Sequence, residues 1–398
     1  MNPLWKRLRS YWREHVSVPL YSPQARQDPY PYYEKLREAA PVHCLRDRRY
    51  WTVSHYEDVR HVLSHPDLYP STGVGQLEKS LSGADDPGHA RVRKIVSRAF
   101  SANHLASLEG RIRDVAEEFV DNIAGRGQCD FVDDLAKPLP LRVMAMLLDL
   151  DPDRWRDYSR WTDAAVVDDK EALGADAKDA IEMDLAEMTA FLEDHLIECR
   201  QGRRQGVCCT EVIPDLTDEE ARDVLKLLLT AGNVTTSHLL GNLAVVLLQN
   251  PEVMHALRAD PELIPTVIEE TLRINTPTLS VPRRPAKDVT LDGQPIPANS
   301  VMFVLLGSAN HDDEKFPDAN RFSLERDTRG HLAFGSGLHY CLGAALSRLE
   351  AKIVLETLLE RLEVIEAAEP LDQIRWEENM HLRGPKRLKL NVRAFPGN

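Results

Sequence analysis

The sequence predicts a mainly α-helical fold with small β-sheets, and three observations carry this prediction. Long segments repeat apolar residues every three to four positions, as amphipathic helices do. Stretches that alternate in the manner of strands are few and short. Hydrophobic residues make up 43% of the 398 residues, enough for a sizeable core. The segments that predict helices most clearly are residues 115–123, 185–197, 224–248 and 342–362.

Four short stretches predict strands at the margins of this helical fold. Residues 51–54 alternate near the start of the chain, and residues 388–392 alternate near its end. Residues 289–291 and 301–306 flank a turn-rich segment that contains glycine, proline and asparagine. These strands are too short and too scattered to build a large sheet.

The longest apolar helix is expected to begin near Thr217. A threonine followed three residues later by Glu220 is the pattern of a capping box, in which each side chain bonds the other residue's backbone. The preceding residues 201–214 predict a surface loop within one domain, with a domain boundary as the alternative. The chain shows no internal repeat or low-complexity linker. We therefore expect one domain over residues 1–398, with residues 1–25 as an N-terminal extension.

Charge and composition exclude several classes of protein. The net charge is −14, which opposes nucleic-acid binding, because that needs Lys and Arg to neutralise phosphates. No stretch reaches the ~18 apolar residues of a membrane span, and the basic N-terminus lacks the apolar core of a signal peptide. We expect a cytoplasmic protein without membrane contact, and a monomer as the default. None of the six cysteines forms a C-x-x-C pair, so we expect reduced, structural cysteines and no zinc or dithiol site.

One cysteine stands in a setting that favours chemistry. Residues 334–343 read F-G-S-G-L-H-Y-C-L-G, in which Gly335 and Gly337 allow a tight turn. Cys341 follows, directly before a predicted helix, where unpaired N–H groups and the helix dipole favour the thiolate. A thiolate here is either a nucleophile or a metal ligand. Gly343 would leave room for a flat ligand beside the helix.

This ten-residue pattern resembles the cysteine-ligand loop of the cytochrome P450 family. The resemblance spans nearly the whole chain and is strongest from residue 227 to residue 350. It implies a single P450 domain with haem b (iron protoporphyrin IX) buried between a distal helix and this loop. Cys341 would be the axial thiolate ligand of the iron, and Phe334, Gly335 and Gly343 would contact the cofactor.

The segment L-T-A-G-N-V-T-T-S, which begins at Leu229, resembles the distal helix of the family. The resemblance makes Gly232 the residue that leaves room beside the iron. It makes Thr235 the alcohol that bends the helix and assists oxygen activation. The family usually has an acid just before this threonine, but here the residue is Val234, which cannot relay protons. Water, Asn233 and Thr236 would take over, or the substrate would supply the group.

Further positions follow from the same resemblance. Glu270 and Arg273, three residues apart on one helical face, match the E-x-x-R helix, and a structural triad with Arg321 is expected. The haem carboxylates need charged donors, because an unpaired buried charge is costly. The resemblance gives this role to His89 and Arg93, which would share a helical face, and to Arg284 and His331. Arg283 competes with Arg284, and the R-x-A spacing favours Arg284.

The function implied is that of a monooxygenase acting on a small organic molecule, expected to be a natural-product intermediate, free or bound to a carrier protein. Two electrons would come from an external ferredoxin and its reductase, since the chain has no flavin or nicotinamide domain. The alternative is a non-catalytic P450-like haem protein that binds a ligand or recruits a partner. A peroxide-driven oxidase is disfavoured. Family members of that kind resemble one another in a distal-helix arginine that holds a substrate carboxylate, and residues 231–235 hold no arginine. Substrate contacts are expected from four regions: residues 71–83 (with Thr72, Gln76 and Ser80), 161–188, 278–281 and 380–382. Arg383 would have a structural role or pair a substrate carboxylate.

Overall fold

The computed structural model describes residues 18–20, 22–45, 50–73, 81–168 and 173–396, which fall into two compact units. Each unit is built from segments far apart in the sequence. Most of the expected N-terminal extension, residues 74–80 with Gln76 and Ser80, and residues 169–172 lie outside the described residues. The candidate boundary at residues 201–214 does not divide the units, because both of its sides belong to the second one. The single P450 domain remains a prediction.

The first unit comprises Met1–Glu78, Glu269–Cys341 and Trp376–Arg383, and its centre is a small sheet. Strands β1 (Val42–Leu45), β2 (Tyr50–Val53), β7 (Val301–Val304) and β4 (Val281–Arg283) pair in that order. Only the β2–β7 pair is parallel within this sheet. Apolar side chains of β2, β7 and the neighbouring α4 form one buried cluster that includes Val53, Val62 and Met302.

A hairpin and four helices complete the first unit in its described part. Strands β5 (Val289–Leu291) and β6 (Gln294–Ile296) meet at a turn where Asp292 and Gly293 both have positive φ, of 45° and 71°. Such a turn matches the twist of a two-residue hairpin. The helices are α2 (Pro23–Gln27), α3 (Tyr30–Ala39), α4 (Tyr56–Ser64) and α13 (Leu306–Ala309).

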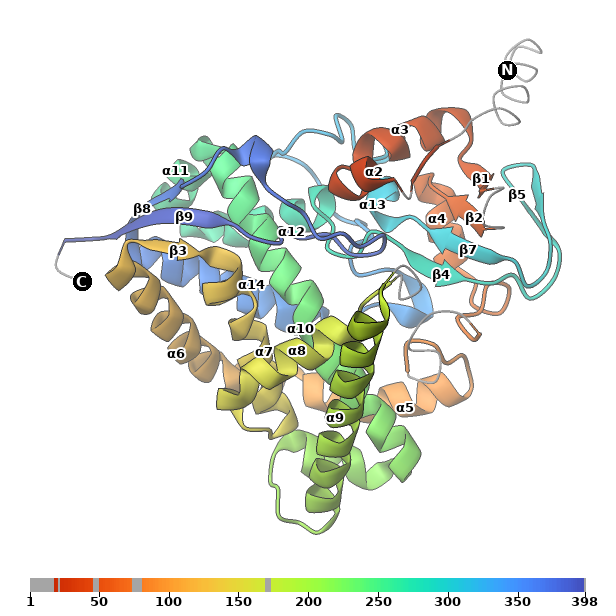
Figure 1. Ribbon diagram of the computed structural model, residues 1–398. Coiled ribbons are helices and arrows are strands. Elements are labelled where there is room, and N and C mark those ends of the chain that lie inside the picture. Colours follow the sequence, from red (N-terminus) through yellow and green to blue (C-terminus); the bar gives the residue numbers. More distant parts are fainter. Residues whose placement is uncertain (1–17, 21, 46–49, 74–80, 169–172, 397–398) are drawn as a thin grey trace. The chain divides into compact units, whose positions relative to one another are not determined.

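The second unit comprises Lys79–Ile268, Leu342–Arg375 and Gly384–Asn398 and is dominated by helices (Figure 1). They are α5 (Gly88–Val96), α6 (Ala102–Arg126), α7 (Pro138–Leu148), α8 (Trp155–Ala165), α9 (Ala175–Arg200), α10 (Asp218–Gln249), α11 (Pro251–Ala259) and α14 (Ala344–Arg361). A three-stranded sheet has the order β3 (Gln128–Asp130), β9 (Lys389–Ala394), β8 (Leu362–Ala367). Helix α12 (Ile264–Ile274) runs through the boundary between the units.

Helix α10 forms the core of the second unit. The predicted capping box is confirmed, since the Thr217 hydroxyl accepts from the Glu220 N–H at 3.2 Å and the Glu220 carboxylate accepts from the Thr217 N–H at 3.0 Å. Among the described helices, α10 alone is long and apolar enough to cross a membrane by length and composition. Since 72% of that apolar window is buried inside the protein, the helix has the burial expected of a core helix.

The segment between α9 and α10 corrects two predictions. Only its first part is a loop, because residues Cys208–Val212 form a π-helical turn, η5, followed by a short 3-10 turn, η6 (Ile213–Asp215). This return of the chain brings the Cα atoms of Cys199 and Cys209 to 4.9 Å, and the two residues form a disulfide. The expectation that all cysteines are reduced was therefore wrong for this pair, which the C-x-x-C criterion could not detect because ten residues separate the two.

Candidate active site

The cysteine loop of the first unit adopts the tight turns that its glycines predict. Gly335 and Gly337 have φ of 70° and 69°, and a Cβ on Gly337 would lie 2.6 Å from the Leu63 carbonyl oxygen. Only glycine fits such a place without strain. The Cys341 N–H donates to the Phe334 carbonyl at 2.9 Å, which closes the loop. Cys341 keeps its thiol and is partly exposed at the end of this turn.

Helix α14 begins at Ala344, three residues after Cys341, with Gly343 as its N-cap. The predicted helix at residues 342–362 is thus confirmed to within two residues. The cap makes no side-chain hydrogen bond, so Gly343 contributes only backbone at this point. A cysteine followed by an uncapped helix start is a suitable position for a thiolate ligand.

Glu270 and Arg273 of α12 form a fully buried pair in the first unit. Nε and one terminal nitrogen of Arg273 each donate to the Glu270 carboxylate at 2.7 Å, and both side chains have no exposed surface. The same carboxylate accepts from Arg326 Nε at 3.0 Å and from the Ser323 N–H at 3.1 Å. Charge-assisted bonds from three sides offset the cost of burying Glu270.

The third cation of this triad is Arg326, and the prediction of Arg321 was wrong. Arg321 contributes only its backbone carbonyl, which accepts from Arg273 at 3.3 Å and from Arg326 at 3.0 Å. The side chain of Arg321 is exposed. The chain turns after Arg321 so that Ser323 reaches Glu270, and this turn directs the later arginine inward.

Four residues were predicted to hold the haem carboxylates, and two of them lie in the first unit. Nε of Arg284 is buried and has no hydrogen-bond partner among the described residues. The competitor, Arg283, donates to the Pro282 carbonyl at 2.7 Å. His331 already has protein partners, because its Nε2 lies 2.9 Å from Glu269 and its Nδ1 accepts from the Ala333 N–H at 3.2 Å.

The other two lie in the second unit, on α5. His89 is 1% exposed, and its Nδ1 is 3.7 Å from the Asp86 carboxylate. Burial, with the charge of Arg93 as the next cause, lowers the pKa of His89. The two residues are four positions apart on α5, a spacing that places them on one side of the helix.

The distal segment of α10 carries an open patch on an otherwise buried helix. Ala231 is exposed and Thr235 half-buried, although the helix around them is packed. The Thr235 hydroxyl donates to the Ala231 carbonyl at 3.0 Å, and the Thr236 hydroxyl bonds the Gly232 carbonyl at 3.1 Å. A hydroxyl that donates to the carbonyl four residues earlier tends to bend the helix. That carbonyl then serves both the side chain and the helix backbone.

Three residues of this segment have partners that the sequence did not indicate. A Cβ on Gly232 would lie 2.6 Å from the sulfur of Met144. In the structure, this glycine therefore makes room for the packing of α10 on α7. Asn233, one of the groups expected to replace the missing acid, is buried and donates to the Thr162 hydroxyl of α8 at 3.1 Å. Thr236 keeps a polar neighbour, the Ser347 hydroxyl of α14, at 3.0 Å.

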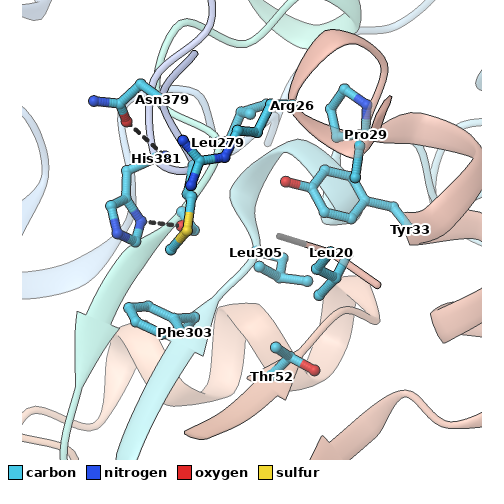
Figure 2. A pocket seen from close by; sticks show the side chains of 13 residues that line it. Leu20, Arg26, Pro29, Tyr33, Thr52, Leu279, Phe303, Leu305, Asn379 and His381 are labelled. Carbon is cyan, nitrogen blue, oxygen red and sulfur yellow. Dashed lines mark hydrogen bonds between the residues drawn. The ribbon is translucent and has the colours of Figure 1, made fainter. Parts of the chain in front are cut away.

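A pocket in the first unit lies between α2, α3, β7 and the segment after Trp376 (Figure 2). Its cavity volume is about 30 Å³. Two of the four regions predicted to contact substrate line it, one through Leu279 and Ser280 and the other through Met380 and His381. The Ser280 hydroxyl lies 2.8 Å from Nδ1 of His381, which ties the two regions together. Most of the remaining wall is apolar.

These residues fit a haem group. The partly exposed thiol of Cys341 offers a soft ligand for iron, and the buried, unpartnered Nε of Arg284 offers a donor for a carboxylate. When haem is bound, it supplies the chemistry of oxygen activation, whereas the chain supplies ligands and charge partners.

Comparisons with known proteins agree with this assessment. The family model described as cytochrome P450 matches residues 209–392. The chain is 36% identical to the cytochrome P450 monooxygenase PikC of Streptomyces venezuelae, over 92% of this chain and 91% of that protein. It is 35% identical to the mycinamicin IV hydroxylase/epoxidase of Micromonospora griseorubida, over 89% and 94%. A solved structure of P450BioI with hexadec-9Z-enoic acid ligated acyl carrier protein matches with a TM-score of 0.86, at 27% identity over 93% and 100%.

The chain belongs to the cytochrome P450 family. It is a P450 monooxygenase that oxidises small molecules, with haem as its cofactor. Bacterial P450s take their electrons from a ferredoxin and its reductase. The mainly helical fold with small sheets is confirmed as the P450 fold.

Sequence reasoning missed two polar residues of this P450, Ser347 and Glu350. Ser347 bonds Thr236, and Glu350, one turn further along α14, is fully buried with neither carboxylate oxygen hydrogen-bonded among the described residues. The only signal in the sequence was a glutamate within the apolar pattern of the helix.

Proposed function

We propose that this P450 oxidises a natural-product intermediate and that Cys341 is the ligand of its haem iron. The observation that carries the assignment is the loop from Phe334 to Cys341, in which two positive-φ glycines present one thiol directly before α14. One of the relatives named above supports the choice of substrate class, since it is the mycinamicin IV hydroxylase/epoxidase.

The roles of the other site residues follow from their contacts. Arg284, with its buried Nε unpaired among the described residues, is the propionate donor that the structure supports most directly. His89 and Arg93 are four positions apart on α5, on one side of the helix, and would serve a second carboxylate. For His331 to serve a propionate, its contact with Glu269 at 2.9 Å would have to be exchanged or shared.

Proton delivery would use Thr235 and Thr236 without a neighbouring acid. Val234 is 8% exposed and cannot carry a proton, and Asn233 is committed to Thr162. The hydroxyls of Thr235, Thr236 and Ser347 remain as polar groups at this level of α10 and α14. We infer that the substrate contributes a polar group of its own, with Gly232 keeping the helices close.

A carrier-bound substrate is the finer version of this proposal. One structural neighbour is solved with an acyl chain on an acyl carrier protein, which shows that a chain of this fold can accept such a substrate. The pocket lined by Leu279, Phe303 and His381 would be part of the substrate's path (Figure 2). The electron donor would be a ferredoxin with its reductase, and the protein would act in the cytoplasm as a monomer.

The first experiment is a spectral titration of the purified ferric protein. Small aromatic acids, polyketides and terpenoids are added free or tethered to a carrier protein, while the haem Soret band is followed. A blue shift means that a ligand has displaced the iron-bound water and identifies the substrate class. A shift with tethered ligands alone would establish the carrier protein as a partner, and a shift with free ligands alone would contradict that part of the proposal.

The second candidate function is a non-catalytic haem protein that binds a ligand, and Val234 is the observation that favours it. A protein that does not turn over needs no acid beside Thr235. Stoichiometric ligand binding without product, under an efficient supply of electrons, would support this alternative. Under the main proposal, Val234→Glu leaves the product yield per electron unchanged or lower. A strong rise would show that the missing acid is a defect.

A further inference from the structure

A cluster of one histidine and two cysteines lies in the second unit, among residues that the P450 reaction does not use. His195 and Cys199 are four residues apart on the last turns of α9, and Cys209 returns to them from η5. All three are buried, with 3%, 6% and 3% of their surface exposed. One donor atom from each residue lies within 4.8 Å of the other two.

The two nitrogen–sulfur distances within the cluster are close to those around a tetrahedral cation. Nε2 of His195 is 3.4 Å from the Cys199 sulfur and 3.6 Å from the Cys209 sulfur. Zinc binds cysteine sulfur at ~2.3 Å and histidine nitrogen at ~2.0–2.1 Å, so that a tetrahedral arrangement places nitrogen and sulfur about 3.6 Å apart. One imidazole nitrogen and two sulfurs are also the soft donors that such a cation prefers.

The disulfide is not alone in holding the three residues together. Hydrogen bonds also fix the chain before and after Cys209. The Asp149 carboxylate accepts from the N–H groups of Gln205 at 2.9 Å and Gly206 at 3.0 Å. A Cβ on Gly206 would lie 2.4 Å from Cβ of Asp149, so that the loop is seated closely against the end of α7. These contacts would keep η5 beside α9 after the sulfur–sulfur bond opens.

Arg200 holds the other side of the loop. Its two terminal nitrogens donate to the carbonyls of Ile213 at 2.7 Å and Leu216 at 2.6 Å, beyond η5. Together with the Asp149 contacts, this arginine brackets Cys209 from both directions along the chain. After reduction, these contacts keep the three donor residues close together, and the two sulfurs have only to separate for both to reach one cation.

We propose that His195, Cys199 and Cys209 form a redox-sensitive binding site for a soft divalent cation of the zinc type. In the reduced state, the two thiolates and the imidazole bind the cation. The structure shows the oxidised state, in which the two sulfurs are joined. In this state they no longer offer two thiolates to a cation. The oxidant is a low-molecular-weight disulfide: the two cysteine thiolates lose two electrons and form the Cys199–Cys209 bond. The external disulfide accepts both electrons, its two thiolates take up two protons, and the cation is released.

The test measures zinc in the holoenzyme relative to haem iron. Full-length protein is reduced with a phosphine, incubated with zinc chloride and desalted, and zinc and iron are measured by mass spectrometry of the elements. We expect about one zinc per chain in the wild type and at least a tenfold lower ratio in His195→Ala, Cys199→Ser and Cys209→Ser. The matched control is Cys208→Ala, which removes a buried cysteine next to Cys209 that is outside the cluster and should keep the zinc.

The second readout is the redox step. Adding oxidised glutathione to the zinc-loaded protein should release the zinc and remove two alkylatable thiols, those of Cys199 and Cys209. The proposal is overturned if zinc retention is equal in the wild type and the three cluster variants. It is also overturned if the reduced wild type holds no zinc, or if the disulfide in the folded protein resists the phosphine, which would make it a fixed structural bond.

Discussion

Arg326 donates through Nε to Glu270 at 3.0 Å, and Arg321, five residues earlier, does not reach this carboxylate with its side chain. Glu270 has no exposed surface, and Arg326 is 8% exposed at its side chain. Since Arg273 occupies another side of the same carboxylate, Glu270 is neutralised by two cations in a closed environment. This network joins α12 to the segment that leads to the cysteine loop.

Removing Arg326 should therefore destabilise the protein strongly. Arg326→Ala leaves part of a buried carboxylate unpaired, and breaking such a pair costs about 3–5 kcal/mol. Arg321→Ala is the matched control, because it keeps the backbone carbonyl that the network uses, and a surface change of this kind costs within about 0.5 kcal/mol. Urea unfolding of both holoproteins, followed by circular dichroism, measures the difference. Equal midpoints for the two variants would contradict the assignment.

The buried histidines predict loss of stability in mild acid. Burial lowers the pKa of His311 to about 4, while its Nε2 bonds the Ile274 carbonyl and its Nδ1 bonds Asn320, each at 2.8 Å. Burial also lowers the pKa of His238 to about 4. In the unfolded chain histidine takes up its proton near pH 6.5, so that the unfolded state binds more protons below this value. The stability contribution is present above pH 6.5 and is lost as the pH falls towards 4.

For one histidine this loss amounts to up to about 3 kcal/mol. His311→Asn should flatten the decline of the urea midpoint between pH 7 and pH 4.5, whatever its effect at neutral pH. His255→Asn, at an exposed position of α11, serves as the control and should leave the slope unchanged. A variant slope equal to that of the wild type would show that His311 is protonated in the folded state.

The sequence predicted those features that depend on local chemistry. The capping box at Thr217 and Glu220, the turn at Gly335 and Gly337, and the helix after Cys341 each follow from a few neighbouring residues. The ion pair of Glu270 and Arg273 was predictable for the same reason, since a spacing of three places both on one helical face. The predicted helix bounds differed from those in the structure by a few residues or more, because the apolar periodicity fades at the helix ends.

The features that it did not predict depend on where distant segments meet. Nothing near Arg321 or Arg326 in the sequence shows which of them will face Glu270, because a turn at Ser323 decides it. The Cys199–Cys209 disulfide depends on the return of the chain along η5. Position 232 requires glycine because of Met144, which lies 88 positions earlier in the chain and on another helix.

Glu350 should make the protein less stable as the pH rises. Burial raises the pKa of Glu350 well above its ordinary value of 4.5, and its oxygens have no partner in the described part of the chain. Between these two pKa values the folded state binds more protons than the unfolded state, so the stability present below pH 4.5 declines towards higher pH. Glu350→Gln removes this dependence and should raise the melting temperature at pH 8 more than at pH 5.

The control for this change is Glu360→Gln, at an exposed position on the same helix, for which we expect the same small effect at both pH values. Thermal unfolding of the wild type and both variants as holoproteins at the two pH values, followed by circular dichroism, gives the six melting temperatures. If Glu350→Gln were destabilising at pH 8, the carboxylate would have to be ionised and paired in the folded enzyme.

Arg284 and Arg283 provide a matched pair for haem binding. Arg284 has a buried Nε without a partner in the described residues, whereas Arg283 donates to the Pro282 carbonyl. We expect Arg284→Ala to speed the loss of haem to apomyoglobin about tenfold, because a charge-assisted bond to a carboxylate contributes on the order of 1.5 kcal/mol or more. Arg283→Ala removes a buried side chain as well, and it should lower thermal stability without changing the rate of haem loss. The reverse result would assign the propionate contact to Arg283 and would make the R-x-A spacing an unreliable guide in this chain.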